Sequence, residues 1–249
     1  MQTIAITGAS SGIGRELALN LACKDSRLLI SSRSKENLQI VANELENLGA
    51  KSEIFAFDVS CEKSSYEWCE YIFRQRVDIL ILNAGISSGL DESAKKQIQI
   101  TKVNCLGIAN TIFYAVEKMQ KQEAIKGKKG HIVLIASIAS FIALPNAPSY
   151  SASKHYVKAL GEALSLAYPD ICFTVVCPGF IKTNLTKHID IKNMMSVELA
   201  AKKIVKAIKQ EKALLVFPFY VAFVAKIYNI LPLCVKKIFR GFFTKKSRL

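Results

Sequence analysis

Two residues four positions apart in this chain carry side chains suited to proton exchange with a substrate. Tyr150 and Lys154 fall in a helical pattern over residues 149–167, so they share one face of the expected helix. A free Tyr phenol has a pKa near ~10, which is too high for efficient proton transfer at neutral pH. A neighbouring ammonium favours the phenolate and lowers that pKa. The pair therefore suits a general acid that protonates a developing alkoxide.

Ser137 ends an apolar run over residues 131–136, upstream of Tyr150. A hydroxyl at the end of a strand can hold a substrate oxygen by a hydrogen bond. Each signal alone has a structural alternative: Tyr150 and Lys154 as an exposed helix pair, and Ser137 as an ordinary strand-end serine. Their occurrence together with a glycine-rich turn favours the catalytic interpretation.

That glycine-rich turn separates the first expected strand from the first expected helix. Its first glycine allows a tight turn, and the later ones let the backbone approach a pyrophosphate and let the helix pack on the strand. The helix N-terminus offers free N–H groups and a partial positive charge to phosphates. The turn predicts a dinucleotide site formed by Thr7, Gly8, Ser10, Ser11, Gly12, Ile13 and Gly14.

Short apolar runs alternate with helical patterns along residues 1–217. The runs are almost wholly apolar, as expected for strands covered on both faces. This alternation predicts an α/β fold with a single Rossmann-type, doubly wound parallel sheet of about seven strands. We expect strands at 2–6, 27–31, 52–57, 77–82, 131–136, 171–176 and 213–217, and helices near 13–24, 35–48, 61–73, 94–120, 150–167 and 196–210.

The chain resembles the classical short-chain dehydrogenase/reductase family across about residues 2–217. The resemblance implies an enzyme that moves hydride between a nicotinamide cofactor and a carbonyl or secondary alcohol. One departure is Leu82, which stands where many members have Asn. The matching motifs are the turn over residues 7–14, Asp58-Val59, Asn83-Ala84-Gly85, Asn104, Ser137, Tyr150-x-x-x-Lys154 and Pro178-Gly179.

The resemblance also implies roles for individual residues. The catalytic set would be Asn104, Ser137, Tyr150 and Lys154, with Asn104 anchoring a water relay and Lys154 also binding the ribose hydroxyls. Asp58 would contact the adenine edge and Val59 the ring. The remaining cofactor contacts would be Asn83, Ala84 and Gly85 along the ribose, and Pro178, Gly179, Ile181 and Thr183 beside the nicotinamide carboxamide.

The end of the second strand predicts which cofactor binds. An NAD enzyme of this fold usually places an acidic residue there to bind the ribose hydroxyls. Residues 30–34 contain no carboxylate, and Arg33 occupies the family position for the 2′-phosphate. A guanidinium pairs strongly with a phosphate, and Ser10 would add a hydroxyl contact. We therefore expect NADP(H).

Positive charge is concentrated at one end of the sequence. The chain has 249 residues and a net charge of +14, from 34 Lys and Arg against 20 Asp and Glu. Residues 218–249 are expected to form an aromatic, basic tail outside the domain of residues 1–217. The tail is interpreted as a membrane-surface segment, a cover for the substrate pocket, or part of an interface between copies. Its prolines and central Lys226 argue against a membrane-spanning helix, and no motif for nucleic-acid binding accompanies the charge.

The seven cysteines and three histidines show no metal-ligand spacing, so we expect no metal site. Scattered cysteines fit free thiols in a reducing compartment, and the N-terminus has no signal-peptide pattern. We expect a cytoplasmic protein, with the tail allowing a place at the inner membrane surface, and a homodimer or homotetramer.

The favoured function is an NADPH-dependent carbonyl reductase, with Tyr150 as the general acid/base, that acts on an apolar and even lipid-like ketone or aldehyde. Residues 184–196 would form the substrate loop, and Phe141, Ile142, Leu144, Met194 and Met195 suggest an apolar pocket. Two alternatives stay open: a small-molecule reductase whose tail mediates assembly, and a non-catalytic NADP-binding regulatory protein.

Overall fold

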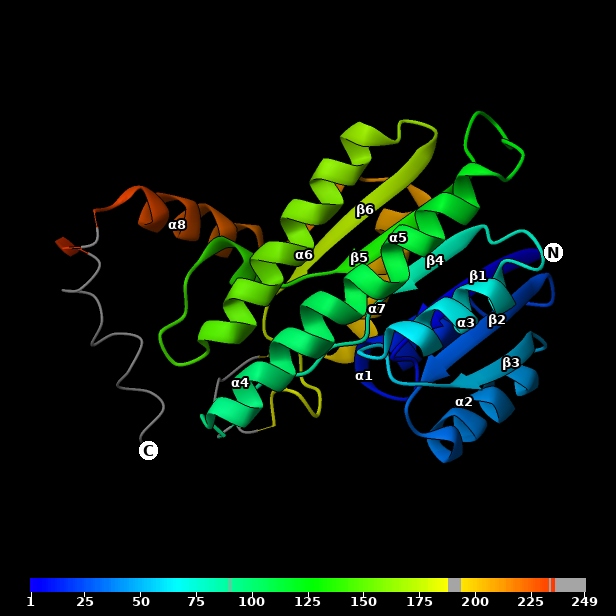
Figure 1. Cartoon of the computed structure of the whole chain (residues 1–249), viewed down its shortest axis with the longest axis horizontal. Coiled ribbons are helices and arrows are strands. Elements are labelled where there is room, and N and C mark those ends of the chain that lie inside the picture. The colour runs from blue at the N-terminus through cyan, green and yellow to red at the C-terminus, as the bar shows by residue number, and fades with distance from the viewer. Residues whose placement is uncertain (90, 188–193, 233, 236–249) are drawn as a thin grey trace.

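A single parallel sheet organises the molecule, in a computed structural model that describes residues 1–89, 91–187, 194–232 and 234–235. In this described part, seven strands lie in the order β3-β2-β1-β4-β5-β6-β7 (Figure 1). The expected doubly wound α/β fold is confirmed. The strands are β1 (Gln2–Thr7), β2 (Ser26–Ser32), β3 (Lys51–Ala56), β4 (Ile79–Leu82), β5 (Gly130–Ile135), β6 (Ile171–Pro178) and β7 (Leu214–Phe217).

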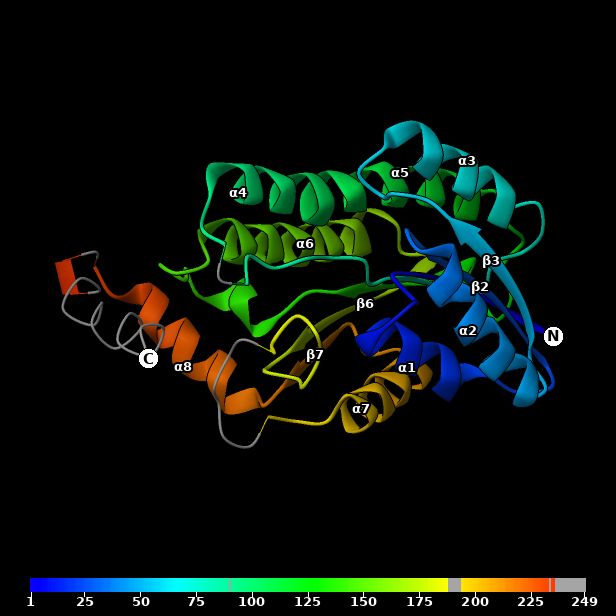
Figure 2. The same cartoon turned by 90° about the horizontal axis from the view of Figure 1, so that it is seen from below.

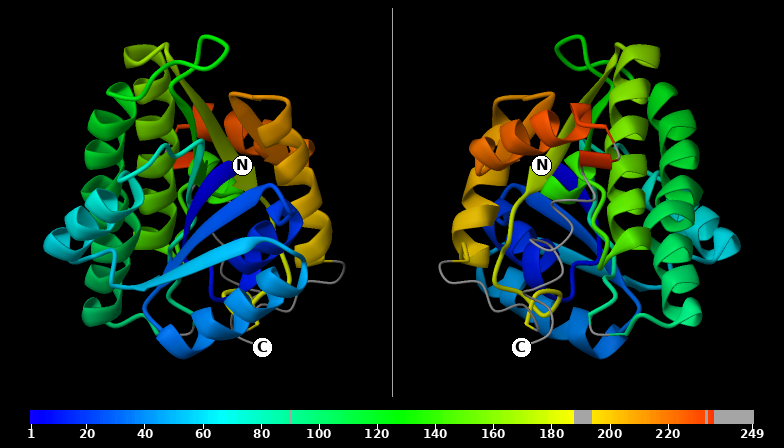
Figure 3. Two further views of the ribbon diagram at one scale, coloured as in Figure 1. Left: turned by 90° about the vertical axis from the view of Figure 1, so that its right-hand side faces the viewer. Right: turned by 90° about the vertical axis from the view of Figure 1, so that its left-hand side faces the viewer.

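Helices cover both faces of the sheet (Figures 2 and 3). One face carries α1 (Gly12–Leu21), α2 (Lys35–Asn47) and α7 (Val197–Lys209), and the other carries α3 (Glu62–Ile72), α4 (Ala94–Thr101), α5 (Gly107–Gln120) and α6 (Pro148–Ala167). Each face buries its own apolar cluster, which explains why the central strands are apolar on both sides. The strand order reverses between β1 and β4, and ligands of such sheets bind at that point, beyond the carboxyl ends of the strands.

The helix expected over residues 94–120 is interrupted. It consists of α4, a π-helical turn over Lys102–Leu106, and α5. A side chain at Gly107 would press on Val59, because an added Cβ would lie 2.7 Å from its Cγ2. The π turn places Asn104 in the interior, where it is 1% exposed. Single π-helical turns are rare in proteins, but those that do occur are often found at functional sites.

A further helix, α8 (Phe219–Ile230), lies within the expected tail. It extends from the end of β7 away from the body of the molecule (Figure 1). It ends before Pro232 because a residue that precedes proline is forced into an extended backbone, as Leu231 is, with ψ at 139°. Among the described residues, no helix is both long and apolar enough to cross a membrane.

Candidate functional site

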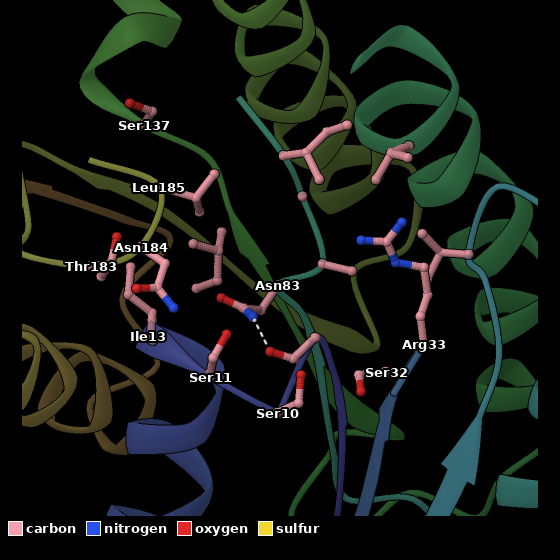
Figure 4. A pocket seen from close by; sticks show the side chains of 18 of the residues that line it. Ser10, Ser11, Ile13, Ser32, Arg33, Asn83, Ser137, Thr183, Asn184 and Leu185 are labelled. Atoms are coloured by element: carbon pink, nitrogen blue, oxygen red, sulfur yellow. Dashed lines mark hydrogen bonds between the residues drawn. The ribbon is translucent and has the colours of Figure 1, made fainter. Parts of the chain in front are cut away.

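A cleft of about 370 Å³ lies at the carboxyl ends of the strands (Figure 4). Its wall combines the glycine-rich turn, the ends of β2, β4, β5 and β6, and the first turns of α6. Most of the predicted site residues line it. They are Gly8, Ser10, Ser11, Gly12, Ile13, Arg33, Asp58, Val59, Asn83, Ala84, Gly85, Ser137, Tyr150, Lys154, Pro178, Gly179, Ile181 and Thr183.

Three side chains at one end of this cleft form a compact proton-handling group. The Lys154 ammonium lies 5.7 Å from the centre of the Tyr150 ring. Its Nζ donates a hydrogen bond of 2.9 Å to the backbone oxygen of Ile135 in β5. Ser137 lies two residues after the end of that strand, and its hydroxyl interacts with the Tyr150 phenol. The helix and the strand expected from the sequence therefore bring these three residues together.

The ionisation of this group differs from the expectation in one respect. Burial raises the pKa of Tyr150, and the Ser137 hydroxyl opposes that change only in part. Burial also lowers the pKa of Lys154, to about 8. In the protein alone the phenol pKa is therefore raised, opposite in direction to the lowering expected from the sequence. Removing the phenolate from water costs more than the Ser137 hydrogen bond returns.

Because its folded-state pKa lies below its ordinary value, Lys154 destabilises the fold at neutral pH. Below pH 8 the folded state carries the full cost of a buried ammonium, and stability rises as pH increases from about 8 to 10.5. We expect Lys154→Met to raise the free energy of unfolding by about 1–2 kcal/mol at pH 7, because the relief of the buried charge exceeds the loss of one hydrogen bond. The variant should also lack the increase in stability between pH 8 and 10.5.

Denaturant unfolding of nucleotide-free protein across this pH range measures the effect. The matched control is Lys158→Met, one turn further along α6, where the ammonium pairs with Glu162 near the surface at 2.6 Å. That change should lower stability by less than about 1 kcal/mol. A Lys154→Met variant less stable than the wild type at pH 7 would contradict the assignment of this cost.

Asn83, which follows β4, holds the glycine-rich turn in place by hydrogen bonds. Its amide donates to the backbone oxygens of Thr7 and Gly8 at 3.1 and 3.0 Å. The Thr7 hydroxyl accepts from the backbone N–H groups of Asn83 and Ala84. A Cβ at Gly14 would lie 2.2 Å from the Gly8 oxygen, so only glycine allows α1 to pack this closely.

Thr7 and Gly14 therefore shape the turn from behind and do not line the cleft, and their place among the cofactor-binding residues stays a prediction.

The turn presents unpaired donors to the cleft. Ser11 is the N-cap residue of α1, yet its side chain makes no capping hydrogen bond, and the first turn of α1 contains no acidic residue. By contrast, Ser34, Ser93 and Ser196 each cap their own helix. An anion at the start of α1 would satisfy these free groups. The chemistry of the turn thus fits a pyrophosphate.

Arg33 faces the same cleft from the end of β2. Its guanidinium extends toward the interior (Figure 4), and within the described ranges it forms no ion pair. No carboxylate lies beside it on residues 30–34. The N–H groups of the Arg33 guanidinium are therefore well suited to bind a phosphate. Ser32, Ser34 and Asn37 line the wall next to it and were not among the residues predicted for the site. The polar end of β2 was the signal for Ser32 and Ser34, and no sequence signal marked Asn37 in α2.

Asn104 lies behind the cleft. Its amide oxygen accepts from the Ile86 N–H at 2.8 Å, and its Nδ2 donates to the Ile86 oxygen and to Ser153. The side chain thus ties the segment after β4 to α6, and both of its N–H donors have protein partners. Asn104 does not line the cleft, and its expected role in anchoring a water relay stays a prediction.

The expected apolar pocket has different walls. Phe141 is 5% exposed in the core, Ile142 packs against that core, and Met195 packs against the opposite cluster. Leu144 and Met194 also lie outside the lining of the cleft. The apolar lining beyond Ser137 comes instead from Ile86 and from the start of the substrate loop, where Leu185 is exposed. Residues 188–193 of that loop lie outside the described residues.

The histidines have structural partners. His131 pairs with Thr174 at 2.8 Å, and His155 contacts the backbone oxygen of Ser151. His188 lies outside the described residues. Among those that are described, no group of three or more His, Cys, Asp or Glu side chains is placed to hold a metal ion.

Comparisons with known proteins bear on the family and the fold. Residues 2–194 match a family model described as short chain dehydrogenase. Dehydrogenase/reductase SDR family member 7B of Xenopus laevis is 35% identical over 196 residues, which cover 74% of this chain and 59% of that protein. The chain thus spans less than two thirds of that relative's length. The 11-beta-hydroxysteroid dehydrogenase-like 2 protein of Arabidopsis thaliana is 31% identical over 93% of this chain and 78% of its own.

A solved structure, the short-chain dehydrogenase from Sphingobium yanoikuyae in complex with NADPH, superposes with a TM-score of 0.78. It is 23% identical and covers 98% of this chain and 96% of its own. This likeness supports the fold.

Proposed function

The chain belongs to the short-chain dehydrogenase family, and from that premise we propose that it is an NADPH-dependent oxidoreductase. It would move hydride between nicotinamide and the carbonyl or secondary alcohol of an apolar substrate. The observation that carries the proposal is that Ser137, Tyr150 and Lys154 line the same cleft as the glycine-rich turn and Arg33. The residues proposed for proton transfer and those proposed for dinucleotide binding therefore line the same cleft.

In this proposal Tyr150 exchanges the proton with the substrate oxygen. Ser137 donates a hydrogen bond to that oxygen and fixes its position beside the phenol. Lys154 is held in place by its hydrogen bond to the Ile135 oxygen. It positions the Tyr150 phenol and carries a positive charge below pH 8. Because burial raises the pKa of Tyr150, the phenol stays protonated at neutral pH and is ready to act as an acid in the reducing direction.

The residues present fit NADP(H). The pyrophosphate would lie on the first amides of α1 and the Ser11 hydroxyl, and the 2′-phosphate between Ser10 and Arg33. Asp58 accepts hydrogen bonds from Ser60 through Oδ1, so its other oxygen is left to meet the adenine edge. Bound nicotinamide supplies the hydride. The remaining cofactor-binding roles expected from the resemblance are retained as part of this proposal.

An apolar substrate is favoured by the cleft wall beyond Ser137. Leu185 is 44% exposed there, and its backbone oxygen accepts a hydrogen bond from Ser87, so the two sides of the mouth are joined. Ile86 lies on the same wall. A substrate with an apolar chain next to its carbonyl would cover these side chains, and removing this apolar surface from water would favour binding.

The test is NADPH consumption with a panel of ketones and aldehydes that differ in the polarity of their side chains. We expect turnover, with apolar carbonyls preferred over polar ones. Leu185→Ser should reduce that preference by about tenfold or less, as expected for one partly buried leucine. Leu166→Ser removes a leucine that is 85% exposed on α6 and should change nothing. The absence of turnover with every carbonyl would contradict the proposed activity, and a preference for polar carbonyls would contradict the substrate class.

A further inference from the structure

Helix α8 carries an exposed apolar stripe. Phe219, Tyr220, Phe223, Val224 and Ile230 are 78%, 60%, 65%, 62% and 84% exposed. With 3.6 residues per turn these positions fall on one side of the helix. Exposed aromatic side chains gathered in this way indicate a contact surface, because a protein surface rarely leaves them together in water.

Positive charge without any acidic residue begins within α8, at Lys226, and continues after the helix. Glu211 is the last acidic residue of the sequence. The seven basic residues after it from position 226 onward are Lys226, Lys236, Lys237, Arg240, Lys245, Lys246 and Arg248. An aromatic face joined to a segment that has basic residues and no acidic ones is the combination that binds anionic lipid surfaces.

The same charge argues against a second copy of the chain as the occupant. A self-complementary interface on α8 would bring two segments of +7 charge to one place, and their repulsion would oppose it. An anionic bilayer complements both parts of the surface, since its headgroups attract the basic residues and its interfacial region accepts aromatic rings.

The base of α8 is joined to the walls of the cleft. The Gly179 N–H donates to the Phe217 oxygen at 2.7 Å, just before α8 begins. A Cβ at Gly179 would lie 2.8 Å from Pro218. The helix also packs against the short 3-10 turn Ile138–Phe141, which follows Ser137. A surface that binds α8 therefore lies beside the substrate side of the cleft.

We propose that α8 and the basic residues after it dock this chain on an anionic lipid bilayer, with the mouth of the cleft beside the lipid. The division into a domain of residues 1–217 and a tail of residues 218–249 then has a physical meaning, because the tail is the docking element. Docking itself is independent of the proposed reaction. Only its consequence, access for an apolar carbonyl dissolved in the membrane, rests on the proposed function.

The experiment is co-sedimentation of the full chain with vesicles of phosphatidylcholine alone and of phosphatidylcholine mixed with phosphatidylglycerol. We expect binding to the mixed vesicles that weakens at high salt, and at least about tenfold weaker binding of the double variant Phe219→Ser/Phe223→Ser. The matched control is Ile40→Ser/Leu166→Ser, which removes two exposed apolar side chains from α2 and α6 and should bind like the wild type.

Three outcomes would overturn the proposal. They are no binding to the anionic vesicles, equal binding of the α8 variant, and a change in oligomeric state of that variant, by light scattering, without any vesicle binding. NADPH binding by every variant verifies that the domain is folded. Because vesicle binding needs no turnover, failure of docking and failure of the proposed activity are read separately.

Discussion

Tyr150→Phe is expected to lower kcat by about 10²- to 10⁴-fold while the affinity for NADPH stays within a few fold of the wild type. The change removes the phenolic hydroxyl, and with it the proton donor and the interaction with Ser137, and leaves the ring in the wall of the cleft. The cofactor contacts proposed for the glycine-rich turn and Arg33 lie on other elements, so they are preserved. Steady-state turnover and fluorescence titration with NADPH measure the two quantities separately.

Tyr156→Phe provides the matched control for this change. Tyr156 lies on α6 as well, is 36% exposed, and does not line the cleft. It loses the same hydroxyl and should keep full activity. A Tyr150→Phe variant with turnover close to that of the wild type would show that another group supplies the proton.

The second large effect is a loss of preference for NADPH in Arg33→Asp. The change would remove the proposed charge-assisted pair with the 2′-phosphate and place a carboxylate against that phosphate. We expect the ratio of kcat/KM for NADPH to kcat/KM for NADH to fall by about 10³-fold, most of it through the KM for NADPH. The new carboxylate also stands where NAD enzymes of this fold bind the ribose hydroxyls, so activity with NADH should be retained or increased.

Lys35→Asp makes the same charge change two residues further on, where the side chain is exposed and does not line the cleft. It should lower the cofactor ratio by less than about threefold, because screening by water and salt weakens an exposed charge. Equal effects of the two variants would mean that Arg33 acts only through general electrostatic attraction.

The strands and the glycine-rich turn could be predicted from the sequence because local pattern decides them. An apolar run buried on both faces has few other structures open to it, as in β4, whose four residues are all buried. The turn is similarly constrained, since Gly8 has a φ of +68° and Gly14 meets the Gly8 oxygen. Positions of this kind tolerate only glycine, so the sequence records them directly.

The π turn and the contacts of Asn104 could not be predicted, because they depend on residues far apart in the chain. The Asn104 amide is fixed by Ile86 and Ser153, which come from the end of β4 and from α6. The apolar lining proposed for the substrate could not be predicted for the same reason. Phe141 is buried in the core, whereas Leu185 lines the cleft. An apolar residue after a strand suits either place, and only the packing of neighbouring elements decides between them.

Hydride transfer to a carbonyl in this cleft, with Tyr150 as the acid, is the step on which the proposed function depends. It is tested most directly with NADPH that carries deuterium at both C4 positions, an apolar ketone, and mass spectrometry of the alcohol that forms. We expect an alcohol that contains deuterium with the wild type and with Tyr156→Phe, formed at least about a hundredfold more slowly with Tyr150→Phe. Binding of NADPH without deuterium in any alcohol would contradict it and would indicate a non-catalytic NADP-binding protein.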